Sequence, residues 1–236
     1  LRGQGRLPPG YHGDQIFDYL HKLAKGINSA FQKKTSSAPP LEPVSFDLRI
    51  GDTRLVGVLD QVFPCGRVDG RFSKLNCRAT LDVWIRHLVL QLLPELKNET
   101  FVIARPFSKK SVTPERKVLK PVANAGSVLE ELLGLFWEGH CAPIPFFPEA
   151  CLQFLWDDRN RDVQDPKKRL RLAIQRARKQ FYGWYGESKD VWVQQAFGSV
   201  DPIDPEFFVD TGVARRSFPE LSRAVLNPLI THRRRG

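Results

Sequence analysis

Apolar residues recur every three to four positions early in the chain, a spacing that predicts a helix. The positions that share this spacing are Ile16, Phe17, Leu20, Leu23, Ala24, Ile27 and Phe31. Asp14 precedes the run, and an aspartate there can accept hydrogen bonds from the first free amides of a helix, so we expect the helix to begin at Asp14. Pro39 and Pro40 cannot continue a helix, and the segment 33–43 should end this one.

The apolar period then changes to two, which is the spacing of half-buried strands. Apolar and polar residues alternate over 44–50, Gly51 and Asp52 provide a turn, and a β-rich stretch follows over 55–63. A second turn leads to further alternation over 68–72. These positions predict a three-stranded meander.

Helical spacing returns over 76–93 and stops at Pro94. We expect a strand at 100–104, with a partner strand near 117–122, and then helices at 128–137, after Pro148, at 169–184, at 191–197 and at 218–226. This order predicts an α/β or α+β fold, a mixed sheet flanked by helices with additional C-terminal helices. We expect one domain over 1–236, with a core at about 11–137 and a helical extension at about 138–236.

The charge balance points to a polyanionic partner. Lysine and arginine outnumber acidic residues by 36 to 26, a formal net charge of +10, and neutralising phosphates releases counterions, so nucleic acid is the natural candidate. Arg233, Arg234 and Arg235 are interpreted as a solvated tail or as sequence foreign to the protein. The sequence has no apolar run of about 18 residues and no basic-then-apolar leader, which predicts a cytoplasmic protein without a membrane partner.

The sequence offers little metal or nucleotide chemistry. The four cysteines, which form no C-x-x-C pair and have no histidines at ligand spacing, are Cys65, Cys77, Cys141 and Cys151. We therefore expect reduced thiols and no bound metal. The sequence also lacks the G-x-x-x-x-G-K-[ST] loop that cradles nucleotide phosphates, so no cofactor is expected in this domain.

Two basic clusters are the candidates for DNA contact. The first comprises Lys109, Lys110, Arg116 and Lys117, in a segment over 105–121 that we expect to project as a mobile loop or hairpin. The second comprises Lys167, Lys168, Arg171 and Arg178, on an expected helix. For the second cluster a merely solvated helix face is an equally good interpretation.

The order helix, meander, helix, strand resembles the PD-(D/E)XK nuclease core found in RecB and AddB proteins. Several stretches resemble the C-terminal domain of RecC, the gamma subunit of exodeoxyribonuclease V. They are GRLPPG at 5–10, LDVWIRHLVL at 81–90, APIPFFPEA at 142–150, ARKQFYG at 177–183 and GESKDVW at 186–192. The resemblance spans nearly the whole chain and implies a nuclease-like fold.

The same resemblance implies that the nuclease site is inactivated. Asp60 matches the metal-binding aspartate of the G-x-x-D motif, but the acidic-x-Lys motif that should follow has Phe72 in place of the acid and keeps only Lys74. The histidine expected on the first helix is replaced by Phe17. A hard cation needs several oxygen ligands, so Asp60 and Lys74 would be vestiges. The competing alignment takes Asp69, Gly70 and Arg71 as the acidic motif, with arginine replacing lysine.

The resemblance therefore implies a non-catalytic subunit of an ATP-dependent helicase-nuclease that acts in double-strand break repair and homologous recombination. Its expected partners are forked or single-stranded DNA ends and RecB-like and RecD-like subunits, which would hold the ATP and magnesium. Two alternatives remain: an active metal-dependent nuclease, and a purely protein-docking module whose basic surface meets acidic partners.

Overall fold

The computed structural model describes residues 4–5, 7–108, 111–160 and 162–235. Its centre is a five-stranded mixed sheet in the order β3-β4-β5-β6-β9. The strands are β3 (Val62–Phe63), β4 (Gly66–Lys74), β5 (Thr100–Arg105), β6 (Glu115–Leu119) and β9 (Arg233–Arg235). β4 and β5 run parallel, and α2 (Cys77–Gln91) supplies the crossover that a parallel pair requires. The predicted mixed sheet flanked by helices is confirmed.

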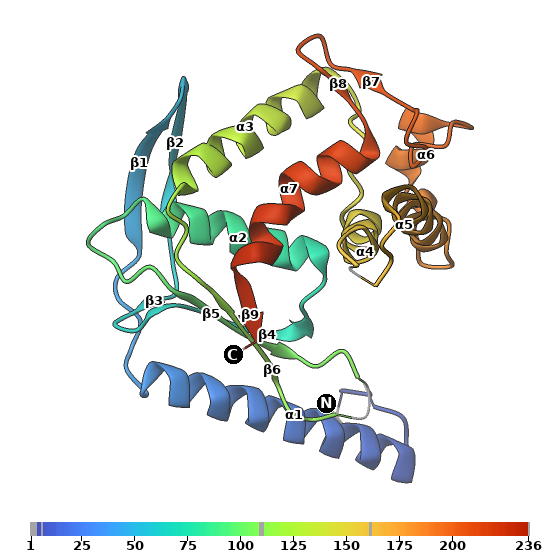
Figure 1. Ribbon diagram of the computed structural model, residues 1–236. Helices are drawn as coiled ribbons and strands as arrows, with labels where there is room; N and C mark the ends of the chain where they lie inside the picture. Colours follow the sequence, from blue (N-terminus) through green and yellow to red (C-terminus); the bar gives the residue numbers. More distant parts are fainter. Residues whose placement is uncertain (1–3, 6, 109–110, 161, 236) are drawn as a thin grey trace.

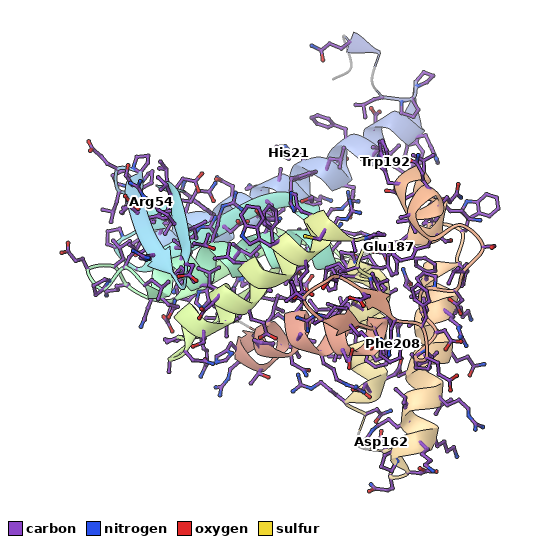
Figure 2. All side chains as sticks on the ribbon, turned by 90° about the horizontal axis from the view of Figure 1, so that it is seen from above. His21, Arg54, Asp162, Glu187, Trp192 and Phe208 are labelled. Atoms are coloured by element: carbon purple, nitrogen blue, oxygen red, sulfur yellow. The ribbon has the colours of Figure 1, made fainter. Side chains whose placement is uncertain are left out.

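A separate hairpin precedes this sheet. β1 (Val44–Ile50) and β2 (Thr53–Leu59) pair antiparallel and form a two-stranded sheet of their own. The predicted meander of three strands was wrong at this point, because the stretch over 55–63 is divided between β2 and β3. Gln61 lies between them with a φ of 56°, in the left-handed region, where a strand cannot continue. Figure 2 shows the hairpin, marked by Arg54, at the opposite end of the molecule from Asp162.

Helices cover both faces of the central sheet (Figure 1). α1 (Tyr11–Thr35) lies on one face and buries Leu23, Ile27 and Ala30 against strand residues that include Val68 and Ile103. α2 and α3 (Ala125–Cys141) cover the other face, where Trp84 and Leu88 pack with Val102 and Leu119. The sheet is therefore the middle of three layers.

The start of α1 differs from the prediction by one turn. The helix begins at Tyr11 with Gly10 as its N-cap, and Asp14 lies in the first turn, where its amide donates to the carbonyl of Gly10 at 3.2 Å. A carboxylate in the first turn still favours the helix through its dipole.

The second half of the chain forms a helical part with an aromatic core. Its elements are α4 (Pro148–Asp158), α5 (Pro166–Phe181), η2 (Glu187–Lys189), α6 (Val191–Phe197), β7 (Val209–Asp210), β8 (Arg215–Arg216) and α7 (Phe218–His232). Phe147, Phe154, Phe181 and Phe218 are buried together in this core. In the described part of the chain, no helix is both long and apolar enough to cross a membrane.

The C-terminal arginines do not form a solvated tail. α7 leads the chain back to the sheet, where β9 pairs with β6 from Leu119–Arg233 to Lys117–Arg235. The guanidinium of Arg233 lies 5.6 Å from the ring centroid of Trp156, a cation–π contact. The interpretation of these residues as a tail was wrong, because an open sheet edge offers hydrogen bonds that charge patterning does not reveal.

Candidate functional site

An open cleft of about 810 Å³ lies between α1, the proline-rich link that follows it, and β4. Its lining is mainly apolar and includes three aromatic residues and three prolines: Phe31, Phe63, Phe72, Pro39, Pro40 and Pro43. Asp60, just after β2, is the one acidic residue among the described residues that line it. The nuclease resemblance predicts the metal centre at this position, so the cleft is the candidate site.

The structure brings together only part of the predicted constellation. Phe72, at the acid's place, lines the cleft with Asp60. Lys74 does not line it. The pairing of β4 with β5 shifts between Gly70 and Lys74, and the Lys74 ammonium instead lies 5.9 Å from the ring centroid of Phe107. Phe17, at the histidine's place, stacks on His21 on α1.

A second carboxylate, Asp69, is held by two arginines. Arg67 is 2% exposed, and its Nη2 lies 3.4 Å from Asp69 Oδ2 and 3.9 Å from Asp60 Oδ1. Arg71 donates to both Asp69 oxygens, at 2.7 and 2.9 Å. One guanidinium nitrogen of Arg67 therefore lies within 4 Å of both carboxylates.

Electrostatics keep Asp69 and Arg67 ionised. Burial opposes ionisation of Asp69, but the hydrogen bonds and charges of Arg71 and Arg67 outweigh it and hold the Asp69 pKa below its ordinary value. Burial lowers the pKa of Arg67 from its high ordinary value, yet an arginine keeps its charge at neutral pH. The Nε and Nη1 atoms of Arg67 are buried without a hydrogen-bond partner among the described residues, so this guanidinium is fixed mainly by charge.

The network continues to α2. Arg71 Nη2 lies 3.8 Å from Asp82 Oδ2, and Asp82 is also paired with Arg86. Within the described residues, no group of three histidine, cysteine or acidic side chains is placed to hold a metal ion. A divalent cation entering between Asp60 and Asp69 would have to displace Arg67. The sequence analysis did not predict this role of Arg67. The sequence indicates it only by placing an arginine two positions before Asp69, on the same side of the strand.

Two residues of the first basic cluster, Arg116 and Lys117, do not lie on a projecting loop. Arg116 and Lys117 lie on β6, within the central sheet, and Lys117 pairs with Glu115 at 2.7 Å. The segment before β6 lies close to α1, since a Cβ built on Gly26 would be 3.2 Å from the carbonyl oxygen of Val112. The expectation that 105–121 projects as a mobile loop or hairpin was therefore wrong for 115–119, because this stretch pairs with β5 as a strand of the central sheet. Lys109 and Lys110 lie outside the described residues.

The second basic cluster is largely brought together on α5. Lys167, Arg171 and Arg178 line an open groove of about 730 Å³ beside 204–206, and Lys168 is exposed next to it. Arg178 is already engaged, since it donates to Asp201 at 2.6 Å and to Asp204 at 3.0 Å. Lys167, Lys168 and Arg171 have no ion-pair partner in the part of the chain that the structure describes.

Comparison with known families decides the relationship. The family model described as the RecC C-terminal domain matches residues 1–159, about two thirds of the chain. The chain belongs to the RecC C-terminal domain family. The RecC match covers the cleft and ends just after α4, so α5 through β9 lie outside it. No curated protein matches the chain.

The part beyond the RecC match is tied to the matched part by carboxylates. Glu187 accepts hydrogen bonds from the amides of Glu149 and Ala150, at 3.1 and 3.0 Å, in the first turn of α4. Glu149 in turn accepts from the amide of Cys77, at 2.7 Å, in the first turn of α2. Glu187 thus accepts hydrogen bonds from free amides of α4, and Glu149 accepts one from α2. Through the bonds of Glu187 the part of the chain after residue 159 is joined to the residues that the RecC model matches.

Proposed function

We propose that this chain is a non-catalytic DNA-handling domain of the gamma subunit of an exodeoxyribonuclease V, a cytoplasmic helicase-nuclease of double-strand break repair and recombination. Family membership supports the assignment to a RecC-type subunit. The observation that carries the non-catalytic role is Arg67, whose guanidinium lies within 4 Å of both Asp60 and Asp69. A nuclease metal needs those carboxylate oxygens free.

In this proposal the domain contributes to splitting the duplex, guiding the strands and docking the helicase subunits. The net charge of +10 supports contact with phosphates, and Lys167, Lys168 and Arg171 supply cations on one helix that no described acidic residue pairs with. RecB-like and RecD-like partners would hold the ATP and magnesium, and this chain would bind forked or single-stranded ends without cutting them.

A nuclease and binding assay tests the proposal. The chain is incubated with linear and forked DNA and Mg²⁺ or Mn²⁺, beside an Asp60→Ala variant. We expect intact DNA in both reactions, and fork binding that weakens steeply as salt is raised. Metal-dependent degradation that disappears in Asp60→Ala would establish the active nuclease instead.

One observation favours the alternative of a purely protein-docking module. Phe136 and Trp137 are each 55% exposed, on one turn of α3, and both contact the ring of His140. Exposed aromatic residues are typical of protein interfaces. Salt-indifferent or absent DNA binding, together with binding to a helicase subunit that Trp137→Ala weakens, would support this alternative.

A further inference from the structure

Trp184 and Tyr185 occupy the centre of a tight turn that follows α5. The amide of Gly186 donates to the carbonyl of Gly183 at 2.9 Å and closes the turn. The two aromatic residues are 86% and 93% exposed. Large rings are normally buried because each gains about 1.5–3 kcal/mol from leaving water. Two rings left in solvent on one tight turn therefore need an explanation other than core packing.

The turn that carries these rings is firmly anchored. Glu187 follows it directly and accepts the two amides of the first turn of α4. On the other side, a Cβ built on Gly186 would lie 2.1 Å from the carbonyl oxygen of Phe181, so a side chain has no room there. Phe181 itself is buried in the helical core. The rings are thus displayed from a preorganised support, which lowers the entropic cost of binding a partner.

A third exposed ring lies a few residues further along the chain. Trp192, at the start of α6, is 74% exposed. Its amide donates to Asp190 Oδ1 at 2.9 Å, which fixes the start of the helix. Figure 2 shows Trp192 and Glu187 on the same arm of the molecule, beside α6. Trp184 and Tyr185 therefore lie on a hydrogen-bonded turn before η2, and Trp192 lies at a capped helix start after it.

Two lysines lie in the same stretch of chain as these rings. Lys179, in the last turn of α5, and Lys189 are exposed, and neither has an ion-pair partner among the described residues. The neighbouring acids are engaged: Glu187 by backbone amides, Asp190 by Trp192, and Asp201 by Arg178 and by the hydroxyl of Tyr182. Exposed rings and exposed lysines in one stretch of chain suit a ligand that offers both phosphates and flat apolar faces.

We propose that Trp184, Tyr185 and Trp192, with Lys179 and Lys189, form a single-strand binding surface, here called the aromatic arm. Bases stack on the rings while the lysines contact phosphates, a combination that binds single strands with little sequence preference. Duplex DNA does not offer this contact, because its bases already stack on one another. The inference rests on the proposed DNA-handling function but names a site outside the residues matched by the family model.

Binding of a fluorescently labelled oligothymidylate to the full 236-residue chain tests the aromatic arm. The double variant Trp184→Ala/Tyr185→Ala should weaken binding by about fivefold or more for each ring removed. The variant Trp184→Phe/Tyr185→Phe keeps flat rings and should retain most of the affinity. Tyr11→Ala removes an exposed ring from α1 and should leave binding unchanged. Circular dichroism checks that each variant is folded.

The outcomes separate the two proposals. If the alanine variant binds oligothymidylate like the parent, the aromatic arm is wrong, while fork binding without cleavage would still support the proposed function. If the parent binds only duplex, or the arm variants lose binding to a helicase subunit and not to DNA, the arm is a different interface and the inference fails. If the parent binds no DNA of any kind at low salt, both proposals fail.

Discussion

Arg216 and Glu138 form a bidentate ion pair that joins β8 to α3, with distances of 2.7 and 2.6 Å. Glu138 is 5% exposed, and the hydroxyl of Thr211 also donates to it at 3.1 Å. The hydrogen bonds from Arg216 outweigh burial and hold the Glu138 pKa below its ordinary value. This pair fastens the β7–β8 loop, which has little apolar core of its own, to the body of the fold.

Replacing Glu138 with Gln should therefore lower the free energy of unfolding by about 1.5–3 kcal/mol, because charged hydrogen bonds to a buried group are removed. Urea unfolding at neutral pH measures this. Since the folded pKa is depressed, the stabilisation is present above the unfolded pKa and is lost as pH falls through the folded one. The gap between parent and Glu138→Gln should thus close in acid. Glu130→Gln, an exposed change on the same helix, is the control; a gap independent of pH would contradict the assignment.

Arg67 Nη2 lies 3.4 Å from Asp69 Oδ2 and 3.9 Å from Asp60 Oδ1, and under the proposed function it occupies the place of a cation, so its removal has two expected consequences. Arg67→Met should destabilise the protein by roughly 3 kcal/mol, because Asp69 keeps only Arg71 while remaining buried. The same variant should gain a weak Mg²⁺ response, seen as a higher melting temperature with the ion, that the parent lacks. Arg86→Met, which removes a more exposed arginine on α2, should show no such response. If Mg²⁺ changes the melting temperature of all three proteins equally, Arg67 does not occupy the place of a cation.

Glu187 caps α4 from a distant part of the chain. Glu187→Ala should lower the free energy of unfolding by about 1–2 kcal/mol, because two helix amides lose their acceptor. Lys189→Ala, an exposed change in the same short helix, should alter the free energy of unfolding by no more than about 0.5 kcal/mol. Thermal unfolding followed by circular dichroism compares the two. Equal melting temperatures would mean that water replaces the carboxylate without loss.

The cations of α5 should divide into two classes. The double variant Lys167→Ala/Arg171→Ala should leave stability nearly unchanged. It should bind DNA with a weaker salt dependence, because the slope of the logarithm of the binding constant against the logarithm of the salt concentration falls in magnitude by about one unit for each phosphate that is no longer neutralised. Arg178→Ala should instead lower stability, because Asp201 and Asp204 are left without their guanidinium partner. Salt-series binding and urea unfolding on both variants separate these effects. Weaker DNA binding by Arg178→Ala alone, with stability unchanged, would reverse the assignment.

Local patterns predicted most helices and strands, because apolar periodicity reflects which face is buried. α1, α2, β1 and β5 were found close to their expected positions. β9 was missed because three consecutive arginines carry no strand signal, and its pairing depends on a sheet edge made far earlier in the chain, at Leu119. In the site, Asp60 and Phe72 both line the cleft, whereas Lys74 does not. The role of Arg67 could not be foreseen, since a buried arginine is recognised only once its carboxylates are placed around it.

The pairing of β9 with β6 also has a consequence for folding and solubility. Pairing between segments so far apart in sequence forms late, because a long loop must close first. Until Arg233–Arg235 reach the sheet, β6 presents an open row of backbone donors and acceptors, the kind of edge that recruits strands from other molecules. The arginines that close it are also well suited to repel another positively charged copy. A chain shortened before β9 should thus fail first by self-association, well before its helices unfold.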